Sequence, residues 1–259
     1  MAKKGQRRSK RSQTVISLEG FFTDSVVVCA GDCSETTHIK EFCDRASRVI
    51  AADAGIFYCH RAGVKPDVWV GDGDSTEKML KAMTSASSAV AETYERVILE
   101  QFLQSVEQEK HPRDKDMSDT ELAVKAAFDR GAKRVALLCS QGKRLDHALA
   151  NIQLLLKHPF KTFSRGRDYI LFSLERGARV RLDGSKGDIL SLFSWTRGCT
   201  VNARSGLRWP LKNESIKVGT RGLSNEMTGQ PVDLTVRTGR LLVFMSPSEH
   251  IPEILKTED

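Results

Sequence analysis

The chain has 259 residues, of which 40% are hydrophobic and 28% charged, a composition typical of a globular protein with one large domain or two modest ones. Its apolar runs fall far short of the ~20 residues that a membrane span needs, which argues against a transmembrane helix. The formal net charge is +7, but six Lys and Arg residues and no acid lie within the first 13 residues. Removing these six from the total of 40 leaves 34 basic against 33 acidic residues, so nucleic acid is not an expected partner of the remaining, nearly neutral chain.

We expect residues 1–14 to form a disordered tail, because basic residues predominate in it. It also lacks the apolar stretch expected of a signal peptide. Six cysteines follow without a C-x-x-C pair. This spacing favours reduced thiols in a cytoplasmic protein over a disulfide framework or a zinc site. Cys29 and Cys33 are four residues apart, but no histidine-rich cluster completes a ligand set, so core packing is the better interpretation of both.

The first part of the chain alternates short apolar runs with segments of helical spacing. The runs at 25–30, 48–52, 68–70 and 134–139 predict buried parallel strands. Helices are expected over 35–47, 56–61 and 148–156 and from residue 122, and the polar segment 76–108 is interpreted as an inserted helical pair. Residues 15–165 are therefore predicted to form an α/β domain with a mostly parallel, Rossmann-like sheet.

Two aspartates follow the third apolar run, in the sequence Gly71-Asp72-Gly73-Asp74-Ser75. In an extended segment residues i and i+2 point the same way, so both carboxylates could face one cation that offsets their repulsion. Mg²⁺ is commonly held by one or two carboxylates together with substrate phosphates. A solvated polar turn is the alternative interpretation of so short a motif.

A capping-box pattern, Ser118 followed by Glu121, places Asp119 and Thr120 in the first turn of a helix. The macrodipole and the free N–H groups of that turn favour acids and bound anions. Asp119 is therefore either a structural first-turn acid or a functional one.

The fourth apolar run leads into Gly142-Lys143-Arg144-Leu145-Asp146-His147. The guanidinium of Arg144 suits phosphate, whereas a histidine near a helix start is interpreted as hydrogen-bonded support. Ligands of open α/β sheets bind at the carboxyl ends of the strands. The candidates that follow a strand or begin a helix are Asp53, Asp72, Asp74, Asp119 and Arg144.

From residue 169 onward the pattern changes to short alternating strands separated by glycines. Alternation with frequent turns predicts an antiparallel β-sandwich, and residues 166–259 are assigned to this second domain.

Several separated motifs together resemble those of the thiamine pyrophosphokinase family, in order and in approximate spacing. In the first domain they are Ala52-Asp53-Ala54-Gly55, Gly71-Asp72-Gly73-Asp74-Ser75, Lys115-Asp116-Met117-Ser118-Asp119 and Gly142-Lys143-Arg144-Leu145-Asp146-His147. In the second domain they are Gly206-Leu207-Arg208-Trp209-Pro210-Leu211 and Gly222-Leu223-Ser224-Asn225-Glu226. Gly73 stands where the family usually has Phe and Ala54 where it usually has Gly, and segment 76–108 is longer than typical.

The resemblance implies an ATP-dependent transfer of a pyrophosphoryl group to the hydroxyl of thiamine, with Mg²⁺ as cofactor and AMP as the second product. It implies an ATP-binding α/β domain followed by a β-sandwich that binds thiamine and dimerises. The active site of the homodimer would then lie between the α/β domain of one subunit and the β domain of the other.

The resemblance also implies residue roles. Asp72, Asp74 and Asp119 would hold Mg²⁺, Asp53 would lie near the metal or assist the incoming hydroxyl, and Arg144 would bind phosphate. Trp209 would stack on thiamine, with core packing as its alternative. Ser224 and Asn225 would bind the aminopyrimidine edge of thiamine; the alternative interpretation of these two residues is an ordinary turn. The further positions expected to bind the cofactor are Asp32, Gly71, Ser75, Lys115, Thr120, Asp146 and His147.

Two other functions remain open at this point. A Mg²⁺-dependent phosphohydrolase, or a kinase for another small alcohol, would use the same acids but would not need Trp209, Ser224 and Asn225. A nucleotide-sensing or nucleic-acid-binding protein would use the basic tail, and the nearly neutral remainder of the chain argues against it.

Overall fold

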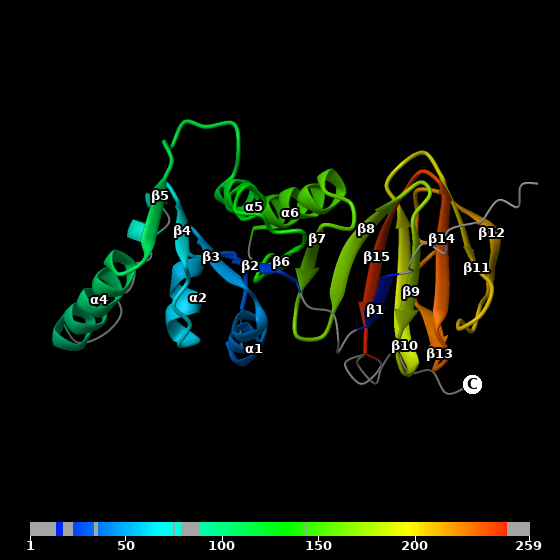
Figure 1. Cartoon of the computed structure of the whole chain (residues 1–259), viewed down its shortest axis with the longest axis horizontal. Helices are drawn as coiled ribbons and strands as arrows, with labels where there is room; N and C mark the ends of the chain where they lie inside the picture. Colours follow the sequence, from blue (N-terminus) through cyan, green and yellow to red (C-terminus); the bar gives the residue numbers. More distant parts are fainter. Residues whose placement is uncertain are drawn as a thin grey trace, which may run out of the picture.

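The computed structural model describes residues 14–17, 23–33, 36–74, 76–78, 89–142 and 144–247. The predicted basic tail up to residue 13, Ser75 and residues 79–88 lie outside the described residues. A sheet of ten strands crosses the molecule, and a second sheet of five strands lies beside one end of it (Figure 1). This is the mixed α/β architecture expected, with a large, mostly parallel sheet and a separate, mostly antiparallel one.

Six neighbouring strands of the large sheet are parallel, in the order β7-β6-β2-β3-β4-β5. Four of them confirm the apolar runs: β2 (Ser25–Val28), β3 (Arg48–Ala52), β4 (Val68–Gly71) and β6 (Val135–Leu138). The other two, β5 (Glu107–Lys110) and β7 (Thr162–Arg165), were not predicted. The segment interpreted as helical up to residue 108 therefore ends in an edge strand.

Helices cover both faces of these parallel strands. Side chains of successive strand residues point to opposite faces, so Val26 and Val28 face one layer of helices and Val27 faces the other. The first layer contains α1 (Thr37–Arg45), α2 (Gly55–Arg61) and α4 (Ala89–Gln104), and the second contains α5 (Asp119–Asp129) and α6 (Leu145–Lys157). No described helix is both long enough and apolar enough to cross a membrane.

The remaining strands of the large sheet are antiparallel and follow β7 in the order β8-β15-β10-β13. Their bounds are β8 (Ile170–Glu175), β10 (Lys186–Ser194), β13 (Asn225–Thr228) and β15 (Arg240–Ser246). The five-stranded sheet has the order β1-β9-β14-β11-β12, with β1 (Thr14–Ser17), β9 (Arg179–Asp183), β11 (Cys199–Ala203), β12 (Leu211–Ile216) and β14 (Val232–Thr238). Although β1 comes first in the chain, it pairs with β9 and not with the parallel strands.

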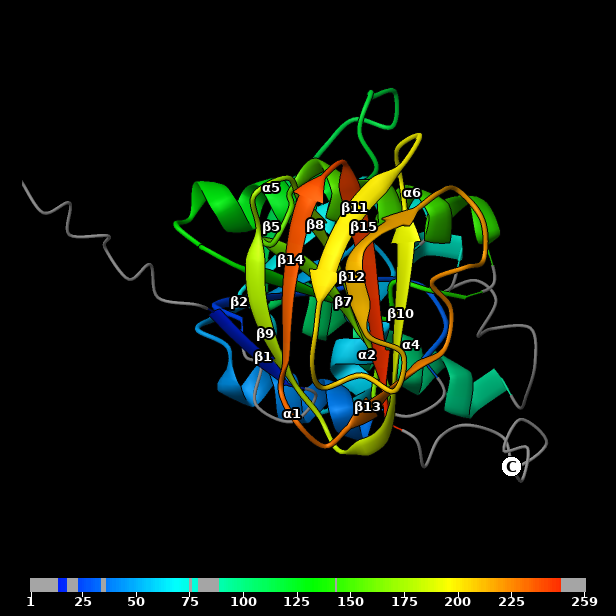
Figure 2. The same cartoon turned by 90° about the vertical axis from the view of Figure 1, so that its right-hand side faces the viewer.

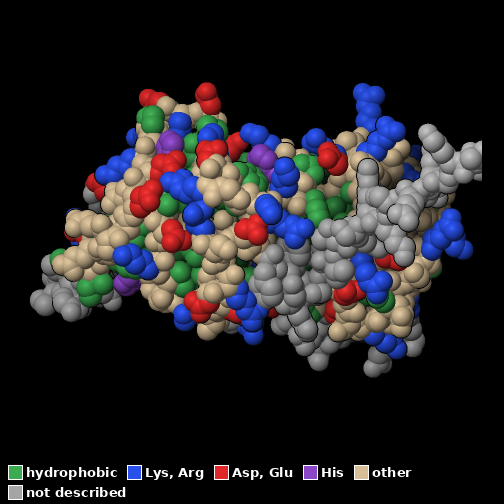
Figure 3. All heavy atoms as spheres, viewed as in Figure 1, with side chains coloured by type: hydrophobic (Ala, Val, Ile, Leu, Met, Phe, Trp, Pro, Cys, Tyr) green, Lys and Arg blue, Asp and Glu red, His purple; other side chains and the backbone are tan. Residues whose placement is uncertain are grey.

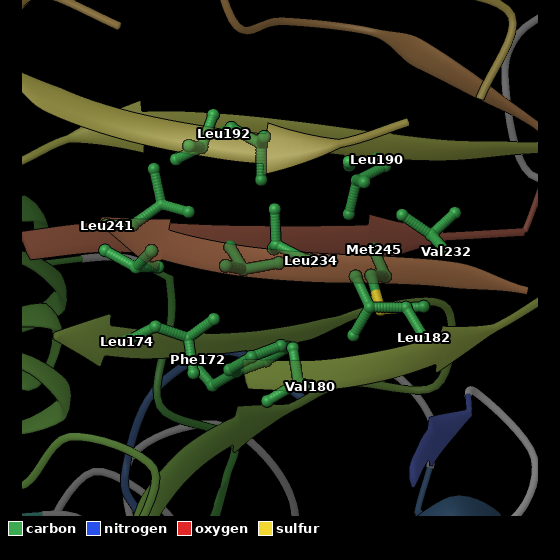
Figure 4. Packing of buried hydrophobic residues seen from close by; sticks show 14 of the residues in the cluster. Phe172, Leu174, Val180, Leu182, Leu190, Leu192, Val232, Leu234, Leu241 and Met245 are labelled. Carbon is green, nitrogen blue, oxygen red and sulfur yellow. The ribbon is translucent and has the colours of Figure 1, made fainter. Parts of the chain in front are cut away.

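One hydrophobic core joins the two sheets. Inward side chains of the antiparallel strands of the large sheet, such as Phe172 and Leu190, meet those of the smaller sheet, such as Leu182 and Leu234 (Figure 4). Figure 2 looks onto the smaller sheet, so that its strands β9, β14 and β11 lie in front of β15 and β8 of the large sheet. The core residues are almost completely buried, so the two sheets form one packed unit.

The order of the parallel strands creates one switch point. The chain passes from β2 to β3 and β4 on one side, and later returns to β6 on the other side of β2. At such a point the loops after two neighbouring strands diverge, and open α/β sheets bind ligands in the resulting crevice.

Candidate active site

Three aspartates from three elements converge at the carboxyl edge of the parallel strands. Asp53 follows β3, Asp72 follows β4 and Asp119 is the first residue of α5, and carboxylate oxygens of all three lie within 4.8 Å of one another. We call these residues the acid cluster. Because β3 and β4 are adjacent and parallel, their carboxyl ends bring Asp53 and Asp72 to the same edge.

Asp53 is held by its surroundings in an unusual backbone conformation. Its φ is +46°, in the left-handed region, and only 7% of the residue is exposed. The hydroxyl of Thr76 donates to Asp53 Oδ1 at 3.1 Å, and the indole N–H of Trp69 donates to the Asp53 carbonyl oxygen at 2.9 Å. Neither Thr76 nor Trp69 was expected from the sequence to support the site.

Lys115 bridges the other two acids. Its Nζ lies 2.8 Å from Asp72 Oδ2 and 3.0 Å from Asp119 Oδ1, and its side chain is only 12% exposed. The hydrogen bond from Lys115 lowers the pKa of Asp72, whereas burial raises the pKa of Asp119 against the opposing effect of Lys115. Burial lowers the pKa of Lys115, but its contacts with the two carboxylates outweigh that effect and leave it raised.

The acid cluster fits a hard divalent cation. Three carboxylates and one ammonium group leave two negative charges in a partly buried space. Asp119 Oδ1 is buried, and Lys115 Nζ lies 3.0 Å from it as an ion-pair partner. Closely spaced carboxylate oxygens are the donors that Mg²⁺ takes in proteins.

Asp74 is not part of the acid cluster. The segment after β4 is a turn and not the extended stretch expected, because Gly73 has a φ of +88° and Asp72 Oδ1 accepts a hydrogen bond from Asp74 N at 2.9 Å. The Asp74 carboxylate instead lies 3.2 Å from Nε of the exposed Arg113. Gly71 ends β4 against Asp53 and Trp69, and a Cβ there would lie 3.2 Å from the Asp53 Cα.

A crevice of about 280 Å³ lies at the switch point, between the loops that follow β2, β6 and β7. Asp32 lines it, and the Asp32 N–H donates to the Gln141 carbonyl oxygen at 2.6 Å. Gly142 has a φ of +130°, and a Cβ there would lie 2.3 Å from Asp32 N. Only glycine therefore allows the two loops to approach this closely.

The remaining residues predicted in the first domain lie apart from the acid cluster. Arg144, Asp146 and His147 are exposed at the start of α6, and Arg144 Nε lies 3.0 Å from Asp146 Oδ1. The Thr120 hydroxyl contacts the thiol of Cys29, whose burial raises its pKa to about 12.

Trp209 lies on the surface of the second part of the molecule, just before β12. Because 52% of it is exposed, core packing does not explain this residue. Asn225, the first residue of β13, accepts from Trp209 N at 3.2 Å and donates to Trp209 O at 2.8 Å. The preceding Ser224 has a φ of +55° and donates its N–H to Ser191 Oγ at 3.0 Å. The two expected thiamine-side motifs are thus joined to each other.

Two family models match the chain. The model described as the thiamin pyrophosphokinase catalytic domain matches residues 39–164, and the one described as the thiamin pyrophosphokinase vitamin B1 binding domain matches residues 178–241. Together these matches span most of the chain.

The chain belongs to the thiamin pyrophosphokinase family. Solved structures of this family have the same fold. A thiamine pyrophosphokinase from Bacillus subtilis is 19% identical, with a TM-score of 0.69 over 86% of this chain and 98% of that one. A thiamin pyrophosphokinase from Candida albicans is 14% identical, with a TM-score of 0.66 over 91% of this chain and 93% of the other. Comparison with curated proteins found no significant match.

Family membership assigns the reaction, which is the ATP-dependent pyrophosphorylation of thiamine. The catalytic-domain match includes all three members of the acid cluster, and the match to the vitamin B1 binding domain includes Trp209 and Asn225.

Proposed function

We propose that the acid cluster holds Mg²⁺ against the phosphates of ATP while a pyrophosphoryl group passes to thiamine. The observation that carries this proposal is the convergence of three carboxylates from three elements around one lysine, with two negative charges left over. When bound, Mg²⁺ would neutralise charge on the phosphate oxygens. Asp53, Asp72 and Asp119 are the proposed ligands, whereas Asp74, also predicted as one, pairs with Arg113.

The side chains around the acid cluster have roles of their own. Lys115 keeps Asp72 and Asp119 close together by offsetting their repulsion. The buried carboxylate of Asp53 lies beside the other two acids, where it could accept a hydrogen bond from the incoming hydroxyl of thiamine. Phosphoryl transfer demands chiefly positioning and charge stabilisation, and rigid neighbours such as Trp69 supply the positioning.

The crevice at the switch point is the proposed location of the nucleotide. It lies at the same edge of the sheet as the acid cluster, because β2 and β3 are adjacent and parallel. Asp32 and the Gln141–Gly142 backbone line it with polar groups. Arg144 could reach phosphate only by leaving Asp146, its present partner.

We further propose that thiamine binds between two subunits. Asp53 follows β3, and Asn225 begins β13, seven strands away in the ten-stranded sheet. At about 4.8 Å per strand, that separation is roughly 34 Å, too far for one small substrate to bridge within a chain. A second copy that brings its Trp209 face to the acid cluster would close the gap. In this homodimer, the parallel part acts as a Rossmann-like ATP-binding domain and the rest as a β-sandwich that binds thiamine.

A cytoplasmic setting is also proposed, since all six cysteines are buried and none forms a disulfide. We do not expect nucleic acid to bind the described part of the chain. On the face shown in Figure 3, acidic and basic side chains are intermixed and form no basic stripe.

The test is a product assay with ATP, Mg²⁺ and thiamine. Wild-type protein should yield AMP and thiamine diphosphate in equal amounts. Asp72→Asn and Asp119→Asn should each lower turnover at least about 100-fold, because each removes a proposed metal ligand. The matched control is Asp114→Asn, because Asp114 is an exposed acid in the loop that precedes Asp119. This variant should keep full activity.

Two outcomes would contradict the proposal. Full activity of both cluster variants would show that these carboxylates do not serve the reaction. Formation of ADP, or consumption of ATP without thiamine, would favour the alternative of a phosphohydrolase or a kinase for another alcohol.

A further inference from the structure

A second group of potential metal ligands lies outside the acid cluster. Cys33, which follows β2, His38 in the first turn of α1 and Cys139, which follows β6, each offer one ligand atom, and these atoms lie within 4.8 Å of one another. We call these residues the cysteine–histidine cluster. The sequence alone does not reveal this arrangement, since the two cysteines lie 106 positions apart.

The spacing of the cluster suits a tetrahedral zinc ion. Zn–S bonds of about 2.3 Å and Zn–N bonds of about 2.0 Å place sulfur and nitrogen ligands roughly 3.6 Å apart across a tetrahedral angle. In the structure Cys33 Sγ lies 4.0 Å from His38 Nε2. For this pair, a shift of a few tenths of an ångström would reach the zinc spacing, and the ligand atom of Cys139 lies within 4.8 Å of both.

The cluster is open to solvent on one side. All three residues line the crevice of about 280 Å³ at the switch point, although Cys33 and Cys139 are only 8% and 7% exposed. An ion can therefore enter, and the crevice leaves room for a fourth ligand such as water. Three protein ligands with an open fourth position are the pattern of catalytic zinc sites, whereas structural zinc sites are closed by four protein ligands.

The backbone conformation of Cys139 is also unusual. Cys139 has a φ of +51°, a left-handed conformation that residues other than Gly, Asn and Asp seldom adopt. Backbone strain of this kind concentrates at functional positions. Cys139 therefore combines a left-handed backbone with a position beside a solvent-accessible crevice. Core packing alone does not explain this combination.

We propose that Cys33, His38 and Cys139 form a binding site for a soft divalent cation, with Zn²⁺ as the fitting ion. Thiolate and imidazole ligands select zinc over the hard ions that carboxylates prefer, so this site and the acid cluster take different metals. Both thiols lose their protons on binding, so one Zn²⁺ releases two protons.

The test is metal binding by the full chain in the absence of ATP and thiamine, so its result does not depend on the proposed function. Excess Mg²⁺ is included to occupy hard-cation sites. We expect one equivalent of Zn²⁺ to bind with the release of about two protons, measured by calorimetry in buffers of different ionisation enthalpy. Co²⁺ in its place should give the sulfur-to-cobalt charge-transfer absorption that only thiolate ligands produce.

The variants Cys33→Ser, Cys139→Ser and His38→Gln should each weaken Zn²⁺ binding at least about tenfold. Cys43→Ser is the matched control, because Cys43 is buried on the same helix as His38 but belongs to no ligand group. Wild-type affinity in both cluster cysteine variants, or a Co²⁺ complex without the charge-transfer band, would overturn the proposal. A Cys33–Cys139 disulfide in purified protein, seen as the loss of two titratable thiols, would overturn it in favour of a redox pair.

Discussion

Trp209 combines an exposed indole with a fixed backbone. Half of the residue is exposed, yet both its N–H and its carbonyl oxygen are held by the side chain of Asn225. The guanidinium of Arg208 lies 4.8 Å from the ring centre and is itself paired with Glu226. A flat aromatic face held in this way is already oriented to stack on a planar ring, so little conformational entropy is lost when a ligand binds.

Trp209→Ala should therefore raise the KM for thiamine about 5- to 30-fold and change the KM for ATP much less. The expected size follows from the ~1–2 kcal/mol of an aromatic contact with a cationic ring. Trp195→Ala is the matched control, because Trp195 is 40% exposed but belongs to neither thiamine-side motif. Equal increases in both KM values would mean that Trp209 supports the site only indirectly.

The residue types of the site could be predicted, but their partners could not. Aspartates at strand ends and a helix start indicate a cation site, and Asp53, Asp72 and Asp119 do converge. The departure of Asp74 depends on the turn at Gly73, whose geometry a motif of two aspartates does not reveal. The cysteine–histidine cluster depends on how β2 and β6 pair, so local spacing could not predict it.

At the scale of elements, the start of α5 matters most for the site, because it positions Asp119. Ser118 Oγ accepts a hydrogen bond from Glu121 N at 3.2 Å, as the capping-box pattern indicated. Ser118→Ala should lower the free energy of unfolding by about 1 kcal/mol. Urea denaturation measures the change, and Ser118→Asp, which restores an acceptor, should recover most of it. No difference between the Ser and Ala proteins would mean that packing alone fixes the helix start.

The end of α6 predicts a pH dependence of stability. His158 caps this helix and packs against Phe128 at 5.1 Å between ring centres, and burial, followed by the charge of Lys157, lowers its pKa from the usual 6.5. Around pH 6 the unfolded chain therefore binds more protons here than the folded one, so stability falls as the pH drops through 6.5.

His158→Gln should remove a small part of the loss of stability between pH 7 and pH 5, as measured by denaturation at both values. His147→Gln, which changes an exposed histidine of the same helix, should leave that loss unchanged. An identical pH dependence in the His158 variant and the wild type would assign the loss to other groups.

Buried strands were easier to predict than edge strands. The apolar runs that became β2, β3, β4 and β6 are buried on both faces, and continuous hydrophobicity marks such strands. Strand β5 has the sequence EQEK and is mostly exposed, so only its pairing with β4 makes it a strand. The terminal strands β12 and β13 are likewise rich in polar residues that carry no regular alternating pattern.

For the molecule as a whole, the shared core predicts cooperative unfolding. Phe172 is fully buried between the two sheets, with the Phe163 ring centre at 5.7 Å. Phe172→Ala should cost about 3–5 kcal/mol, while Leu223→Ala, at an exposed position, should cost less than about 0.5 kcal/mol. Far-ultraviolet circular dichroism and tryptophan fluorescence should report one coincident transition in urea. Two separate transitions would show that the parallel and antiparallel parts unfold independently.

The pairing of β7 with β8 also determines how the molecule can move. Phe163, Ser164 and Arg165 are aligned with Phe172, Leu171 and Ile170, so the large sheet passes without interruption from the parallel to the antiparallel strands. A hinge motion between the parallel and antiparallel strands would have to break the backbone hydrogen bonds between β7 and β8. We therefore expect the two parts of the molecule to move together as one rigid body. Domain closure within one chain therefore cannot exclude water from the reacting phosphates. Loops or a second subunit must do so instead.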